Sequence, residues 1–119
     1  MNVVDSSGWL EYFSDGKNAQ KFSAPLQDVD NLIVPTITIF EVFKVVFRER
    51  GESDALQAIA AMKQGTVADL SSEIAMQSAK ASHELGIPMA DSIILTTART
   101  HNATVWTQDD HFKGFDDCK

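Results

Sequence analysis

The chain has 119 residues, enough for one domain with one hydrophobic core and too few for a second. Hydrophobic residues make up 44% of the sequence, which is normal for a globular protein and excludes an intrinsically disordered chain. The formal net charge of -7 argues against a nucleic-acid binder that relies on phosphate neutralisation alone. It does not exclude nucleic-acid binding, because an acidic metal site would account for several of the negative charges.

The only cysteine, Cys118, excludes an intramolecular disulfide and a cysteine-based metal site. The first residues lack a basic region and turn acidic within five positions, which is not the pattern of a secretory signal peptide. No apolar stretch approaches the ~20 residues that a membrane span requires. We therefore expect a soluble, cytoplasmic protein that does not contact a membrane.

Short apolar runs alternate with segments of helical spacing along the chain. We predict strands at 3–4, 32–34, 66–70 and 103–106, helices at 9–13, 18–27, 36–50, 52–62, 71–85 and 90–101, and a helical turn at 108–112. Thr36 or Thr38 should cap the third helix, and Gly51 should end it. Strands that alternate with helices indicate an α/β fold with a central parallel sheet flanked by helices.

Four acidic residues lie beside apolar segments, where a carboxylate is costly to desolvate unless it is paired or binds a metal. Asp5 and Asp109 follow predicted strands, Asp91 opens a helix, and Glu41 interrupts the apolar run of the third helix. The ligand crevice of a parallel α/β sheet lies at the carboxyl ends of its strands, where Asp5 and Asp109 should project. A divalent cation such as Mg²⁺ or Mn²⁺, which prefers oxygen ligands, is the simplest explanation for all four.

Three of these acids also have a purely structural interpretation. Asp5 would cap the first helix, and Asp91 would complement the helix dipole. Asp109 would cap the turn that contains His111, and the adjacent Asp110 leaves the identity of the site acid open at this position.

Glu41 has two interpretations of similar weight. It could pair with Lys44 on a solvated helix face, an interaction worth only ~0.3–0.5 kcal/mol. Alternatively it faces the crevice, with Lys44 and Arg48 as a positive rim beside it. No serine–histidine–acid set or glycine-rich phosphate loop is visible. His83 and His101 are interpreted as helix surface residues, and His111 lies nearer the site.

The residues around the four acids resemble the motifs of PIN-domain ribonucleases, specifically the VapC toxins of bacterial toxin–antitoxin pairs. The matching segments, in order, are Val3-Val4-Asp5-Ser6-Ser7-Gly8-Trp9-Leu10-Glu11-Tyr12, Thr38-Ile39-Phe40-Glu41-Val42, Met89-Ala90-Asp91-Ser92-Ile93-Ile94 and Thr107-Gln108-Asp109-Asp110-His111-Phe112. The resemblance spans nearly the whole chain. It implies one PIN domain over residues 1–119, with a parallel sheet of four to five strands.

Carried over residue by residue, the resemblance implies a catalytic Mg²⁺ or Mn²⁺ site. The acids that would bind the metal are Asp5, Glu41, Asp91 and Asp109; the supporting residues are Ser6, Thr107 and Asp110; the basic residues placed to bind substrate are Lys44 and Arg48. The chain stops soon after the fourth strand, so the family's further strand should be short, missing or supplied by a partner.

The function implied is that of a metal-dependent endoribonuclease, the toxin of a type II toxin–antitoxin system, which cleaves tRNA or another structured RNA. The resemblance further implies a homodimer and a VapB-type antitoxin whose C-terminal segment blocks the site. One alternative is a PIN-fold protein that only binds partners. A receiver-like phosphoacceptor domain is a weaker one, because adjacent acids after the first strand and a lysine after the last are missing. A phosphatase or a DNA nuclease could use the same ions.

Overall fold

The computed structural model describes residues 1–119. Its elements, in chain order, are β1 (Asn2–Val4), α1 (Ser6–Phe13), α2 (Ala19–Gln27), the 3-10 helix η1 (Val29–Asn31), β2 (Leu32–Pro35), α3 (Thr36–Arg50), α4 (Glu52–Met62), β3 (Thr66–Ala68), α5 (Ser72–Leu85), α6 (Met89–Thr100), β4 (Thr104–Trp106) and the 3-10 helix η2 (Asp110–Phe112). Every predicted strand and helix is present, with ends shifted by a few residues at most sites. None of the helices combines the length and apolar character that a membrane crossing requires.

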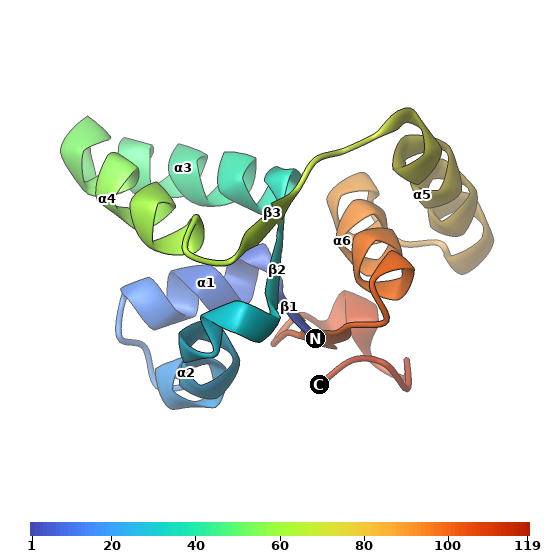
Figure 1. Ribbon diagram of the computed structural model, residues 1–119, viewed down its shortest axis with the longest axis horizontal. Helices are drawn as coiled ribbons and strands as arrows, with labels where there is room; N and C mark the ends of the chain where they lie inside the picture. Colours follow the sequence, from blue (N-terminus) through green and yellow to red (C-terminus); the bar gives the residue numbers. More distant parts are fainter.

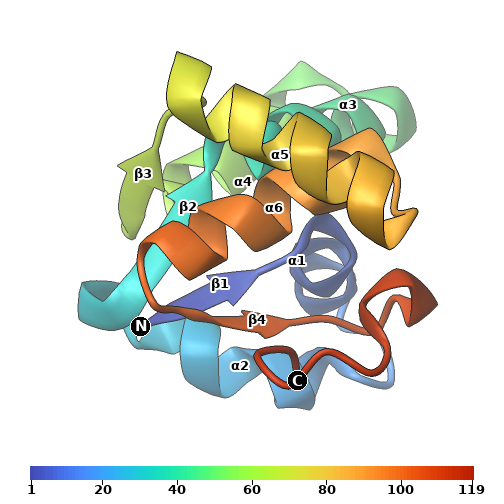
Figure 2. The same cartoon turned by 90° about the vertical axis from the view of Figure 1, so that its right-hand side faces the viewer.

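The four strands form one parallel sheet in the order β3-β2-β1-β4. The first strand of the chain therefore lies in the middle, between β2 and β4 (Figure 2). Val3 is in register with Ile33 on one side and with Val105 on the other. An all-parallel sheet with helical connections confirms the predicted α/β fold.

Helices cover both faces of the sheet, and each face has its own hydrophobic cluster. Val4 and Val34 pack with residues of α1, α2, α3 and α4, whereas Val3 and Ile33 pack with residues of α6. This division follows from the alternation of side chains along a strand. Figure 1 shows α1 to α4 on one side of the strands and α5 and α6 on the other.

Two local features set the position of the helices next to the sheet. A Cβ atom at Gly8 would lie 2.6 Å from a Val4 methyl group and 2.8 Å from the Phe22 ring, so only glycine lets α1 approach β1 and α2 this closely. Gly51 ends α3 with a φ of 92°, as predicted.

The predicted threonine cap of α3 is wrong. The helix begins immediately after β2, so Pro35 occupies the N-cap position and makes no side-chain cap hydrogen bond. Thr38 is fully buried, and its hydroxyl instead donates to the Pro35 carbonyl at 2.7 Å. A strand that passes directly into a helix leaves no residue outside the helix to serve as a hydroxyl cap.

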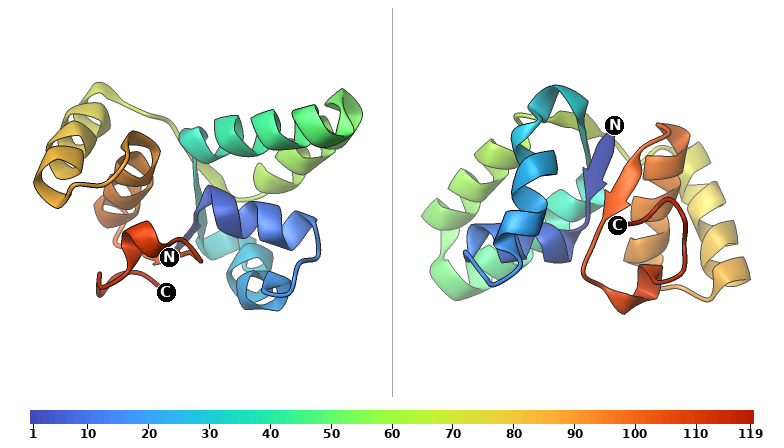
Figure 3. Two further views of the ribbon diagram at one scale, coloured as in Figure 1. Left: turned by 180° about the vertical axis from the view of Figure 1, so that it is seen from behind. Right: turned by 90° about the horizontal axis from the view of Figure 1, so that it is seen from below.

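The C-terminal residues return to the outer edge of β4. The Val105 amide donates to the Asp117 carbonyl at 2.9 Å, and Cys118 forms an isolated parallel bridge with Val105. Arg99 holds this tail through two hydrogen bonds to the Asp117 carboxylate, at 2.8 and 3.3 Å. The further strand is thus short, a single bridge supplied by the chain itself, and the C-terminus lies close to the N-terminus (Figure 3).

Candidate metal and active site

The carboxyl ends of β1 and β4 bring Asp5 and Thr107 together. The two strands are adjacent, and their ladder continues for one residue because the Asp5 amide donates to the Trp106 carbonyl at 3.1 Å. Beyond this point the Thr107 hydroxyl donates to Asp5 Oδ2 at 2.5 Å. The crevice predicted at the carboxyl end of the sheet therefore starts from these two residues.

Asp5 is almost completely buried, with 3% of its surface exposed. Its carboxylate accepts hydrogen bonds from the Gly8 amide at 2.8 Å and from the Ser7 hydroxyl at 2.9 Å, in addition to the bond from Thr107. The Gly8 bond shows that Asp5 also caps α1, so both interpretations of this residue hold. Burial raises the pKa of Asp5 despite these three donors, and the negative charge of Asp109 adds to the increase.

Asp91 and Asp109 meet at one nitrogen of the His111 imidazole. Asp91 lies in the first turn of α6, and Asp109 is the N-cap of η2. His111 Nδ1 lies 2.6 Å from Asp91 Oδ2 and 3.1 Å from Asp109 Oδ1. Burial raises the pKa of Asp91, and the charge of Asp109 contributes, while the His111 hydrogen bond acts in the opposite direction.

Thr107 connects these two groups of acids. Its hydroxyl, which donates to Asp5, also accepts a hydrogen bond from the Asp109 amide at 2.8 Å. Its backbone carbonyl accepts from Lys21 Nζ of α2 at 2.7 Å. The side chain directly after β4 thus fixes the buried acid directly after β1 and the start of the turn that carries Asp109.

Glu41 joins the site through Ser6. Ser6 follows Asp5 in the chain, and its hydroxyl donates to Glu41 Oε1 at 2.5 Å. The alternative Glu41–Lys44 pair is not formed: Lys44 lies over the Phe40 ring, with Nζ 6.0 Å from its centroid. The predicted Glu41–Lys44 pair is therefore absent; Glu41 is half-buried, and the hydroxyl of Ser6 holds its carboxylate on the side of α1.

The other predicted residues lie outside this network. Asp110 is exposed and contacts none of the four acids, which identifies Asp109 as the acid of this segment that joins the group. Arg48 forms an exposed ion pair with Glu49 at 3.5 Å, and Lys44 is exposed. Substrate binding by Lys44 and Arg48 stays a prediction.

Sequence analysis placed His111 near the site without giving it a role, and it did not identify Ser7 or Lys21 as part of the network. His111 had a usable signal, because a residue two positions after a site acid on a tight turn projects towards the same crevice. Lys21 had none, since its contact with Thr107 spans 86 positions along the chain.

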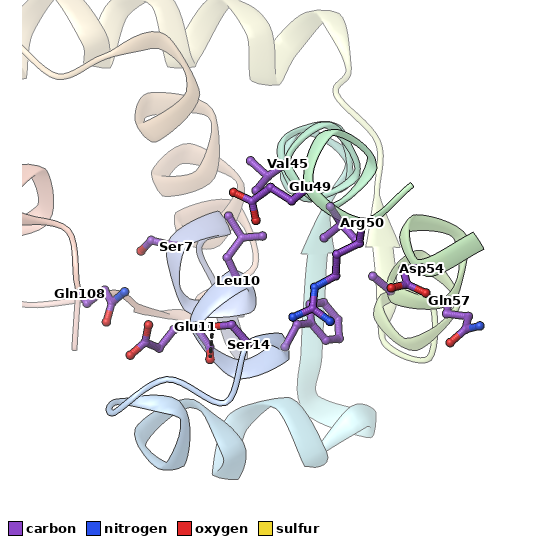
Figure 4. Close-up of a pocket in the computed structure, with 13 residues that line it drawn as sticks. Ser7, Leu10, Glu11, Ser14, Val45, Glu49, Arg50, Asp54, Gln57 and Gln108 are labelled. Atoms are coloured by element: carbon purple, nitrogen blue, oxygen red, sulfur yellow. Dashed lines mark hydrogen bonds between the residues drawn. The ribbon is translucent and has the colours of Figure 1, made fainter. Parts of the chain in front are cut away.

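A cleft of about 700 Å³ opens between α1, α3 and α4, and none of the four acids lines it. Ser7 and Gln108, which adjoin Asp5 and Asp109 in the chain, lie at its end nearest the site. Figure 4 shows side chains of α1 on one side and of α4 on the other, with α3 contributing Glu49 and Arg50. The cleft mixes apolar and charged side chains and touches the site through Ser7, whose hydroxyl donates to Asp5.

The site fits a divalent cation. Ligand atoms of Asp91, Asp109 and His111 all lie within 4.8 Å of one another. None of the four acids forms an ion pair with a lysine or arginine. The two arginine ion pairs of the protein are Arg48 with Glu49 and Arg99 with Asp117. Burial and mutual repulsion oppose ionisation of Asp5 and Asp91, and a bound cation would relieve both effects.

Comparison with known proteins identifies a family. A PIN domain family model matches residues 3–117. No curated protein sequence matches the chain significantly.

Three solved structures share the fold. A toxin–antitoxin complex from Klebsiella pneumoniae aligns with a TM-score of 0.84 and 21% identity, covering 100% of this chain and 96% of the other. VapBC2 from Rickettsia felis, bound to a DNA fragment from its promoter, aligns with a TM-score of 0.75 and 13% identity, covering 99% of this chain and 96% of the other. VapC20 from Mycobacterium tuberculosis, a Sarcin-Ricin loop cleaving toxin, aligns with a TM-score of 0.77 and 13% identity, covering 94% of this chain and 92% of the other. The sequence match over nearly the whole chain, together with the sheet and the four acids at its carboxyl edge, shows that this chain belongs to the PIN domain family.

Proposed function

We propose that this protein is a divalent-metal-dependent endoribonuclease and the toxin component of a type II toxin–antitoxin system. The observation that carries the proposal is the clustering of Asp5, Asp91 and Asp109, without a lysine or arginine partner, at the carboxyl edge of a PIN-domain sheet. Toxins and toxin–antitoxin complexes among the structural neighbours support the toxin assignment. Residues 1–119 would form one PIN domain, active in the cytoplasm.

Each site residue has a role that its contacts suggest. Asp5, Asp91 and Asp109 would hold Mg²⁺ or Mn²⁺, with Glu41 completing the site. Bound there, the ion would supply positive charge to the scissile phosphate and lower the pKa of the attacking water. Thr107 orients Asp5 and the Asp109 turn, and Ser6 orients Glu41. Glu41 Oε2 forms no hydrogen bond within the protein, so it is free to orient a water or accept its proton.

The substrate proposed is tRNA or another structured RNA with an accessible loop. Such RNAs present unstacked bases and a bent backbone to a protein, and recognition of this kind depends on shape more than on net charge. One structural neighbour is itself a Sarcin-Ricin loop cleaving toxin. Lys44 and Arg48 on α3 would contact the RNA backbone.

The partner proposed is a VapB-type antitoxin. A segment of the antitoxin lying in the cleft between α1, α3 and α4 would reach the acids at the end marked by Ser7 and Gln108. We also propose a homodimer, which would cover exposed apolar side chains such as Phe40, with 62% of its surface accessible. Membership of the PIN family leaves no support for the receiver-like alternative.

The test is cleavage of a structured RNA by the purified protein in the presence of Mn²⁺ or Mg²⁺. Asp5→Asn, Glu41→Gln, Asp91→Asn and Asp109→Asn should each lower the rate by at least about a hundredfold, as expected when a transition-state charge loses its support. Asp69→Asn is the matched control, because Asp69 also follows a strand but is exposed. Full activity of the four variants would refute the catalytic role of these acids. Metal binding by wild type without any RNA cleavage would favour the partner-binding alternative.

A further inference from the structure

His111 occupies a place that the proposed mechanism does not explain. Of the three histidines, only this one contacts carboxylates, and it contacts two of them with the same nitrogen. His83 is exposed on α5, and His101 bonds the Thr97 carbonyl at 2.9 Å. The His111 side chain is itself about half exposed, with 52% of its surface accessible, so burial does not force the ring against the acids.

The turn η2 fixes the direction of the ring. Phe112, with 1% of its surface exposed, anchors the turn in the hydrophobic cluster around α6 and β4. The His111 amide donates to Asp109 Oδ1 at 2.9 Å, and the Asp109 amide is held in turn by Thr107. The imidazole therefore starts from a rigid backbone next to Asp109 and needs no rearrangement to reach Asp91.

The distances suit coordination of one ion. Octahedral ligands at ~2.1 Å from a divalent metal are about 3.0 Å apart along each edge of the octahedron. His111 Nδ1 lies 2.6 Å from Asp91 Oδ2 and 3.1 Å from Asp109 Oδ1, both close to this separation. Ligand atoms of all three residues lie within 4.8 Å of one another. A small shift of the half-exposed His111 ring between the two carboxylates would let all three residues hold a common ion.

We propose that His111 Nδ1 is a direct protein ligand of the ion held by Asp91 and Asp109, and that this nitrogen makes the site prefer Mn²⁺ or a later transition ion to Mg²⁺. This inference rests on the metal site of the proposed function. Oxygen ligands suit Mg²⁺ and Mn²⁺ alike, whereas imidazole binds transition ions more strongly than Mg²⁺. Replacing one water or carboxylate by imidazole therefore changes selectivity more than it changes the general ability to hold a cation.

The experiment compares the binding of Mn²⁺ and of Mg²⁺ to wild type, His111→Ala and the matched control His83→Ala. Free Mn²⁺ is counted by its electron paramagnetic resonance signal, and Mg²⁺ binding is measured by competition, in one buffer on the alkaline side of neutrality. We expect His111→Ala to weaken Mn²⁺ binding at least about tenfold, the lower bound seen when a supporting residue of a metal site is lost. Mg²⁺ binding should change by less than about threefold, and His83→Ala should bind both ions as wild type does.

Electron spin echo modulation of bound Mn²⁺ supplies a readout that is independent of affinity. Wild type and His83→Ala should show coupling to a directly bound nitrogen, and His111→Ala should lose it. Equal losses for both ions would mean that His111 only positions the acids. Tighter binding in His111→Ala would mean that the ring occupies the ion's place and is displaced by it. Either result, or a missing nitrogen signal in wild type, overturns the proposal.

Failure of the proposed function is a separate result. Nitrogen coupling and Mn²⁺ selectivity without RNA cleavage would leave the His111 ligand intact and remove the nuclease assignment. RNA cleavage that depends on Asp5 and Asp91, without nitrogen coupling to bound Mn²⁺, would support the nuclease assignment and remove the His111 ligand. Circular dichroism of the variants confirms that each is folded, which the exposure of both histidines leads us to expect.

Discussion

Thr107→Val removes one hydroxyl and leaves the size and shape of the side chain nearly unchanged. In the folded protein that hydroxyl donates to Asp5 at 2.5 Å and accepts from the Asp109 amide at 2.8 Å, in a residue with 7% of its surface exposed. A hydrogen bond to a charged group contributes ~1.5–3 kcal/mol, and the second bond adds ~0.5–1.5 kcal/mol. We expect the free energy of unfolding near pH 7 to fall by about 2–4 kcal/mol.

The cost should depend on pH in a specific direction. The Thr107 bond lowers the pKa of Asp5 against the opposing effect of burial, so it stabilises the ionised carboxylate. Its contribution is present above the folded pKa of Asp5 and is lost as pH falls through that value. At about pH 3, below the ordinary pKa of an aspartate, only the smaller bond to the Asp109 amide should remain.

Urea unfolding followed by circular dichroism measures both quantities. With a slope of ~1–3 kcal/mol per molar urea, the midpoint should fall by roughly 1–2 M near neutral pH. Thr104→Val is the control, because Thr104 lies on β4, the strand that Thr107 follows, and its hydroxyl makes no hydrogen bond within the protein; its cost should stay within ~0.5 kcal/mol. The reasoning is refuted if Thr107→Val lowers the free energy of unfolding no more than Thr104→Val does, or lowers it equally near pH 7 and at about pH 3.

Three further predictions concern charge and support around the site. In EDTA, Asp5→Asn should become more thermally stable relative to wild type as pH rises above about 4, because a folded pKa raised by burial means that wild type loses stability as this carboxyl ionises. Mn²⁺ should cancel the difference. A difference in melting temperature that stays constant across pH would contradict this prediction. Arg99→Ala should cost up to ~1 kcal/mol at pH 7 in urea titrations. The cost should shrink as pH falls below the ordinary pKa of an aspartate, because Arg99 lowers the pKa of Asp117 and the stability from the pair is lost as pH falls through that lowered value. Asp117→Asn should behave alike. Lys21→Met should weaken Mn²⁺ binding about tenfold in calorimetric titrations while Lys17→Met does not, because Lys21 supports Thr107.

Much of the fold was predictable because its signals are local. Strands such as β1 and β2 consist of consecutive buried apolar residues, and Gly51 and Gly86 end helices with positive φ values of 92° and 68°. The order of the strands in the sheet is not a local property. It depends on which residues meet across the whole chain, as when Val3 pairs with Val105.

The site was predictable in composition and less so in geometry. Asp5, Asp91 and Asp109 stand out as acids beside apolar segments, and the structure links them through Thr107 and His111. The start of α3 was assigned a wrong cap because Pro35 occupies the position that a hydroxyl would need. Lys21 was missed because it satisfies a backbone carbonyl of another element, a role that leaves no pattern in the sequence around it.

The central position of β1 has a consequence for how the protein becomes active during synthesis. β1 is synthesised about a hundred residues before β4, the strand with which it pairs, and Asp5 waits as long for Thr107 and Asp109. At ~5–20 residues per second, the incomplete chain spends several seconds with half of its site missing. A chain interrupted between β1 and β4 would therefore lack Thr107, Asp109 and His111, and with them half of the proposed metal site.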